Sequence, residues 1–218
     1  MAKSGILQSG KSYTFRSYFE MTYEPDEILA EFGVSLQRLE LALPRTEIDL
    51  EPVETLKQTI QRRLPYISLT SEAARRETLI APVVLSLIDY TQAQLRIEYA
   101  INVSEQLKGV LDYYLQSQAG LLVIEAKNAD LARGFTQLAV ELIALDQWID
   151  SEIPSLYGII STGDVWQFGC FHRAQKLMQQ DLALYRVPTD LQELFCILVA
   201  LLTQETTKEG GGMAEDGR

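Results

Sequence analysis

Hydrophobic positions change their spacing several times along the chain, and each change predicts a new element. Apolar residues recur at helical spacing through residues 51–64, and Pro65 ends that run. A second apolar stripe at helical spacing begins after Ser71, which can cap a helix. Pro82 falls within this stripe, so we expect the helix to be kinked or divided there.

From residue 94 to residue 127 the spacing becomes strand-like, in the segments LRIEYAINV, LKGVLDYYL and GLLVIEAK. A helix rich in Ala, Leu and Gln is predicted at 131–149, and SLYGIISTGDVWQFG then predicts a β-hairpin around Thr-Gly-Asp. A last helix is expected at 190–203. The order helix, three strands, helix, strands predicts an α/β fold with a mixed central sheet flanked by helices.

Residues 1–65 are expected to form an N-terminal extension packed on this core. They contain the aromatic segment SYTFRSYFEMTY, which favours β structure, a short helical stretch after Pro25, and the alternating VSLQRLELALP, which favours a strand. The main domain is then predicted at 66–205. Residues 206–218 are rich in glycine and charge, so we expect a flexible tail.

Composition narrows the function classes. No apolar run reaches the length of roughly 18 to 20 residues that a membrane span needs, and no signal peptide is recognisable, so a soluble cytoplasmic protein without membrane contact is expected. The two cysteines are far apart and the chain has one histidine, which argues against disulfide scaffolds and against zinc sites built from thiolates or imidazoles. The formal net charge of −11 weighs against tight nonspecific DNA binding, although a local basic strip such as Arg75–Arg76 can persist on an acidic surface.

Three charged residues stand in the two central predicted strands. Asp112 lies in the middle of one strand, and Glu125 and Lys127 lie two apart near the end of the next, where alternation puts both on the same face. If the two strands pair, Asp112 can lie beside Glu125. Two carboxylates make a hard oxygen site suited to magnesium, although a simple Glu–Lys salt bridge at the strand end is an equally ordinary explanation of the pattern.

The arrangement D-x12-E-x-K, set in helix, three strands, helix and strand, resembles the PD-(D/E)xK restriction-endonuclease-like nuclease superfamily. The resemblance covers residues 71–169. The order of helices and strands is a more specific sign of this superfamily than the short D-x12-E-x-K motif. Leu111 stands where the family often has proline. Gln137 matches a glutamine that many members place about ten residues after the lysine, and Glu77 matches an acid often supplied by the first helix, a place that Glu72 could also fill.

The resemblance implies a restriction-endonuclease-like core and a Mg²⁺-dependent nuclease that hydrolyses phosphodiester bonds of DNA, or of RNA. Its metal ligands would be Asp112, Glu125, Glu77 and the main-chain carbonyl near Ala126, and Mn²⁺ may substitute for Mg²⁺. Asp112, Glu125, Lys127 and Gln137 would form the catalytic set. Lys127 would position or deprotonate the attacking water, and Gln137 would orient Lys127 or a phosphate.

Other functions stay open at this point. The fold could be a catalytically inactive interaction module, which the acidic charge favours, and the apolar 194–202 segment is either core or the interface of a homodimer. The segment GILQSGKS, residues 5–12, matches the P-loop pattern, but only MAKS precedes it, so a strand before the loop is not expected. His172 has no nucleophile-elbow sequence beside it and is expected at a surface or hairpin end.

Overall fold

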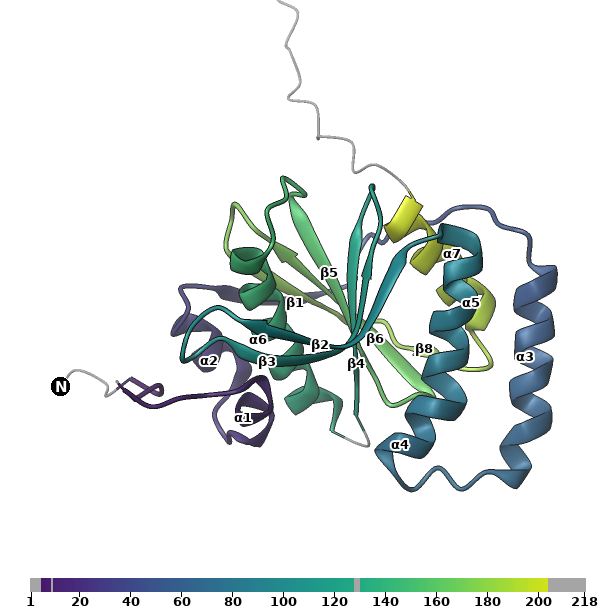
Figure 1. The fold of residues 1–218 in the computed structure, drawn as a ribbon, viewed down its shortest axis with the longest axis horizontal. Coiled ribbons are helices and arrows are strands. Elements are labelled where there is room, and N and C mark those ends of the chain that lie inside the picture. The colour runs from purple at the N-terminus through teal and green to yellow at the C-terminus, as the bar shows by residue number, and fades with distance from the viewer. Residues whose placement is uncertain (1–4, 9, 128–129, 204–218) are drawn as a thin grey trace, which may run out of the picture.

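The computed structural model describes residues 5–8, 10–127 and 130–203, and the predicted 206–218 tail lies outside these residues. A mixed eight-stranded sheet forms its centre (Figure 1), with seven strands in the order β1-β7-β6-β5-β4-β3-β2 and β8 paired with β6. The α/β class and the mixed sheet flanked by helices are therefore confirmed. The strands are β1 (Ser35–Leu39), β2 (Gln94–Asn102), β3 (Lys108–Gln116), β4 (Leu121–Ala126), β5 (Ser155–Ser161), β6 (Val165–His172), β7 (Leu177–Asp181) and β8 (Tyr185–Arg186).

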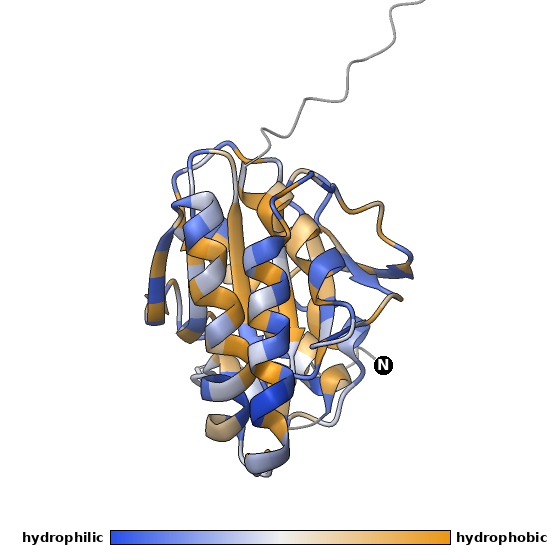
Figure 2. Ribbon diagram, turned by 90° about the vertical axis from the view of Figure 1, so that its right-hand side faces the viewer, coloured by the Kyte–Doolittle hydropathy of each residue, from blue (hydrophilic) through white to orange (hydrophobic). Residues whose placement is uncertain are grey.

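Helices cover both faces of the sheet in two groups. One group is α1 (Phe15–Glu20), α2 (Pro25–Ala30) and α6 (Leu131–Trp148), and the other is α3 (Glu51–Arg63), α4 (Glu72–Arg75), α5 (Ala81–Thr91) and α7 (Leu191–Thr203). Each group closes a separate hydrophobic cluster against one face. On the face covered by α3 and α5, hydrophobic residues concentrate on the strands behind the helices (Figure 2). None of the described helices is long and apolar enough to cross a membrane.

The N-terminal residues are built into the same sheet. Strand β1 pairs in parallel with β7, and this edge joins residues 35–39 to residues 177–181. The predicted helix after Pro25 and the predicted strand are confirmed as α2 and β1. The β-rich interpretation of the aromatic segment was wrong, because Phe15–Glu20 forms a helix whose Phe15 and Tyr18 are buried. The described residues within 5–12 form neither strand nor helix.

The helix predicted after Ser71 is present but irregular. Ser71 caps it, accepting a hydrogen bond from the Ala74 amide at 3.1 Å. The segment Arg76–Ile80 is π-helical, and α5 begins beyond it with Pro82 in its first turn, where a missing amide N–H costs nothing. The expected division of the helix is confirmed, and the irregular turn lies on the N-terminal side of the proline.

The central strands follow the predicted order. Strands β2, β3 and β4 are antiparallel neighbours, and α6 then carries the chain back so that β5 runs parallel to β4. The hairpin of β5 and β6 is confirmed. Strands β7 and β8 were missed, since LMQQD is mostly polar and the other strand has two residues.

The last helix is part of the core. Residues of α7 belong to the same hydrophobic cluster as those of α5, and Leu194, Phe195 and Leu198 are fully buried. The apolar 194–202 segment is therefore accounted for by core packing and provides no exposed face for a homodimer.

Candidate active site

The carboxylate of Asp112 is held at the point where β3 and β4 stop pairing. The backbone pairing of these strands ends at Tyr113 and Ile124. Beyond this pair the amide of Ala126 has no backbone partner on β3. Asp112 Oδ2 takes its place and accepts a hydrogen bond from the Ala126 amide at 2.8 Å. The paired strands thus bring Asp112 to the end of β4, beside Glu125.

Glu125 and Lys127 meet at this strand end. Lys127 Nζ donates to Glu125 Oε1 at 2.6 Å, and the two side chains are only 12% and 3% exposed. The ammonium also lies 5.4 Å from the centre of the Phe19 ring, so α1 contributes a cation–π contact to the site. The main chain of Lys127 is fixed by a hydrogen bond to the Ser161 carbonyl at 2.8 Å.

Helix α6 supplies the remaining polar groups. Gln137 Nε2 donates to Glu125 Oε1 at 2.5 Å and to Glu141 Oε1 at 2.8 Å. Gln137 and Glu141 are one turn apart on the same face of the helix, and both are buried. The structure therefore brings Asp112, Glu125, Lys127 and Gln137 together as predicted. It adds Glu141, whose only sequence signal is an acid four residues after the glutamine in an otherwise apolar helix.

Three buried oxygens of this cluster have no hydrogen-bond partner among the described residues. They are Glu125 Oε2, Gln137 Oε1 and Glu141 Oε2. An unpartnered polar atom in a protein interior is costly and marks a place where a proton, a water or an ion is expected. The cluster therefore has hydrogen-bond acceptors that none of the described residues uses.

Burial shifts the ionisation of these groups. It raises the pKa of Glu125 to about 7, an effect that the neighbouring Asp112 charge reinforces and Lys127 opposes. Burial and the charge of Glu125 raise the pKa of Glu141 well above its usual range. Burial alone lowers the pKa of Lys127, but the adjacent Glu125 outweighs that effect, so the pKa of the lysine is raised. Shifted, mutually dependent carboxyl groups of this kind are typical of functional sites.

The backbone is irregular around Asp112. The ladder of β2 and β3 contains the pairs Ile97–Tyr113 and Tyr99–Leu111 but skips the residues between them, Glu98 and Asp112. Glu98 has φ +53°, a left-handed conformation that a non-glycine residue adopts at a cost of about 1–3 kcal/mol. A strained residue opposite a candidate ligand indicates that the strands are shaped for the site rather than for regular pairing.

Glu77 lies at the edge of this cluster. Its side chain is 66% exposed, and its carboxylate pairs with Arg76 at 3.6 Å. Glu72 also lies near the site: the pKa of Asp112 is raised chiefly by burial, and the charge of Glu72 adds to the rise. Among the described residues no group of three His, Cys, Asp or Glu side chains is arranged to hold a metal ion.

Two carboxylates still fit a magnesium ion. Mg²⁺ is usually held by one or two carboxylates and completes its shell with waters and substrate oxygens. Asp112 and Glu125 are such a pair, close enough that the charge of Asp112 raises the pKa of Glu125, and Glu125 Oε2 has no hydrogen-bond partner among the described residues. The residues present therefore suit a hard cation, with water as the remaining ligands.

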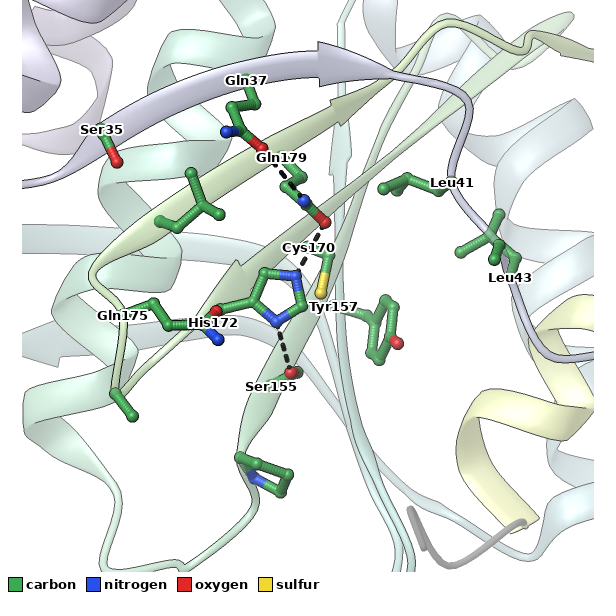
Figure 3. Close-up of a pocket in the computed structure, with 14 residues that line it drawn as sticks. Ser35, Gln37, Leu41, Leu43, Ser155, Tyr157, Cys170, His172, Gln175 and Gln179 are labelled. Carbon is green, nitrogen blue, oxygen red and sulfur yellow. Dashed lines mark hydrogen bonds between the residues drawn. The ribbon is translucent and has the colours of Figure 1, made fainter. Parts of the chain in front are cut away.

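A cavity lies elsewhere, on the opposite face of the sheet (Figure 3). It measures about 920 Å³ and is lined by residues of β1, β5, β6 and β7. His172 is part of its wall, with Nδ1 3.0 Å from Ser155 Oγ and Nε2 2.8 Å from Gln179 Oε1. The lining contains no carboxylate, lysine or arginine. The cavity is thus separate from the carboxylate site and is lined by neutral polar and apolar side chains.

A scan against protein-family models finds no match to this chain, and searches of curated proteins and of solved structures find none either.

Proposed function

We propose that this chain is a Mg²⁺-dependent nuclease that hydrolyses phosphodiester bonds of DNA, or of RNA. The observation that carries the proposal is the convergence of Asp112, Glu125 and Lys127 at the end of β4, with the buried Glu125 Oε2 left unpartnered. A salt bridge formed for stability alone would not require a second carboxylate, a glutamine and a strained strand around it.

The chain order supports assignment to a restriction-endonuclease-like core. An irregular helix precedes the antiparallel β2, β3 and β4, and α6 then leads to β5, which runs parallel to β4. This is the order on which the resemblance to PD-(D/E)xK nucleases rests. The candidate residues lie where the pairing of β3 and β4 ends.

Mg²⁺ bound by Asp112 and Glu125 would lower the pKa of a bound water and neutralise charge on the phosphate. The protein's own groups then have separate tasks. Lys127 donates to Glu125, and this neighbour raises the pKa of its amine. With a cation held by Glu125, the lysine would contact a phosphoryl oxygen or position the attacking water, and it would accept that water's proton if the cation lowered the pKa of the amine. Gln137 keeps Glu125 in place through its amide.

The test is cleavage of mixed DNA and RNA substrates with Mg²⁺ by the whole chain and by the variants Asp112→Ala and Lys127→Ala. We expect the wild type to cleave and each variant to lose at least about 100-fold in rate. Retention of the fold is checked by the melting temperature of each variant. Crystals soaked in Mn²⁺ should show metal density between Asp112 and Glu125. Undiminished cleavage by both variants would show that any nuclease activity resides elsewhere.

A catalytically inactive interaction module is the second candidate, and the net charge of −11 favours it because phosphate backbones repel an acidic surface. This candidate predicts no cleavage by the wild type and no rise in melting temperature with Mg²⁺ or Mn²⁺. The two measurements together separate the two functions.

A further inference from the structure

The guanidinium of Arg76 faces three carboxylates at the edge of the candidate site. Nη1 lies 3.3 Å from Glu98 Oε1 and 3.9 Å from Asp112 Oδ1, and Nε lies 3.6 Å from Glu77 Oε1. The side chains of Glu77 and Glu98 are 66% and 63% exposed, whereas that of Asp112 is 17% exposed. Arg76 is therefore a second cation, beside Lys127, that offsets the charge of Asp112, and it does so from the more exposed edge of the site.

These contacts hold Arg76 only loosely. The separation from Asp112 is longer than a hydrogen bond, so the attraction acts through space without fixing the geometry. The two shorter contacts involve exposed carboxylates, and such pairs contribute little because water screens them. Arg76 can consequently exchange its partners at small cost.

The neighbouring Arg75 provides a contrast. Its guanidinium binds the carbonyls of Leu69 and Thr162, each at 2.9 Å, and the carboxylate of Asp164 at 2.7 Å. It ties the helix to the turn between β5 and β6. Of these two consecutive arginines, one is anchored to the main chain and the other is left facing the site.

Two backbone irregularities converge on Arg76. It begins the π-helical segment Arg76–Ile80, and one of its partners is Glu98, the residue with φ +53° opposite Asp112. π-Helical turns occur frequently at functional sites, where they redirect a side chain. A helix and a strand are thus both distorted where the guanidinium meets the carboxylates.

We propose that Arg76 is a phosphate-binding residue of this site, which offsets the charge of Asp112 in the cation-free protein and contacts a phosphate of the nucleic-acid strand once a divalent cation is bound. The inference rests on the proposed nuclease function. A cation at Asp112 repels the guanidinium, and the planar fork of arginine matches a phosphate with two parallel hydrogen bonds. An acidic chain also requires such a local cation to hold a polyanion.

The first test measures metal binding without nucleic acid. Arg76→Gln removes the charge that competes with the cation, so the Mn²⁺ concentration giving half of the rise in melting temperature should fall about five-fold. Arg76→Lys keeps the charge and should leave this midpoint near that of the wild type. Arg62→Gln, a change of an exposed arginine on α3, is the matched control and should also leave it unchanged.

The second test measures binding of labelled duplex and single-stranded DNA with Mg²⁺ present, in a Lys127→Ala background that prevents cleavage. Adding Arg76→Gln should weaken binding about ten-fold and reduce the slope of log affinity against log salt by about one, the loss of one phosphate contact. Arg76→Lys should retain the slope but bind less tightly than arginine, because it lacks the fork.

The outcomes separate the two proposals. If the wild type binds Mn²⁺ and cleaves while Arg76→Gln changes neither the metal midpoint nor the salt slope, the role of Arg76 is wrong and the nuclease stands. If the wild type neither binds Mn²⁺ nor cleaves, the nuclease proposal fails, and the role of Arg76 fails with it. Should Arg76→Gln not fold, the lysine variant decides, since unchanged DNA affinity in that variant contradicts the proposed contact.

Discussion

The side chain of Asp112 accepts a hydrogen bond from the amide of Ala126 at the end of β4. It replaces the backbone acceptor that β3 no longer provides beyond the Tyr113–Ile124 pair. The same carboxylate is a candidate metal ligand through its other oxygen. Structure and chemistry therefore depend on different properties of this residue: an acceptor atom for the strand, and a charge for the cation.

Two substitutions of Asp112 separate these properties. Asp112→Asn keeps an acceptor oxygen, so its free energy of unfolding should stay within about 1 kcal/mol of the wild type, whereas Asp112→Ala leaves the Ala126 amide unpartnered and should cost about 1–3 kcal/mol. Both variants should lose cleavage. Urea denaturation provides the stabilities, and equal values for the two variants would contradict the role of the hydrogen bond.

Metal binding should depend steeply on pH. Burial raises the pKa of Glu125 to about 7, and a cation binds only the ionised carboxylate. Metal affinity should therefore fall by up to about ten-fold for each pH unit below that value and level off above it. The Mn²⁺ dependence of the melting temperature, measured at several pH values, checks this, and a flat profile would argue against Glu125 as a ligand.

Glu141 should destabilise the fold as pH rises. Its pKa in the folded protein lies above the ordinary value of 4.5, so the folded state holds the proton longer, and stability falls as pH rises from that value toward the folded pKa. Glu141→Gln removes this dependence. The melting temperature of the variant should increase relative to that of the wild type as pH rises above 4.5.

The control for this series is Glu152→Gln, a change of an exposed carboxylate outside the helices and strands. Its melting temperature should run parallel to that of the wild type across the same pH range. If Glu141→Gln also runs parallel, the buried carboxyl does not retain its proton.

Gly134 lets α6 approach Lys127. A Cβ at this position would lie 2.7 Å from Ile160 Cδ1 and 3.1 Å from Lys127 Cγ. Although alanine favours helices by about 1 kcal/mol, Gly134→Ala should destabilise the protein and also slow cleavage by displacing the lysine stem. Gly158→Ala is the matched control, because its Cβ would meet Leu138 of the same helix at 2.8 Å. It should destabilise without slowing cleavage by the folded fraction.

The sequence predicted the parts of the site that follow from strand alternation. Alternation places Glu125 and Lys127 on one face of their strand, and Asp112 joins them once the two strands are taken to pair. Gln137 was found only through the resemblance to the nuclease superfamily. Glu141 could have been found from its spacing to Gln137, but an acid in an apolar helix more often faces solvent. Burial, not sequence pattern, shows that it belongs to the site.

The sequence showed Arg75–Arg76 as a basic pair, but the position of Arg76 among the carboxylates and the distortion at Glu98 were beyond sequence reasoning. A π-helical turn and a positive φ at a non-glycine residue arise from tertiary packing. The segment RETLI does not predict the first by its sequence, and the segment RIEYA does not predict the second. Strand β7 was missed for a similar reason. Strand β7 pairs with β1, and the paired residues Gln37 and Gln179 are 142 positions apart in the sequence. A pairing over such a distance cannot be read from local sequence.

The ring of Phe19 over Lys127 has a consequence for anyone who divides this chain into modules. The N-terminal extension supplies, through Phe19, a side chain that contacts a residue of the candidate site. A shortened protein that starts near residue 66 would lose the Phe19 contact to Lys127 and the edge strand β1. If such a protein failed to cleave nucleic acid, the result would therefore not show that the intact chain is inactive.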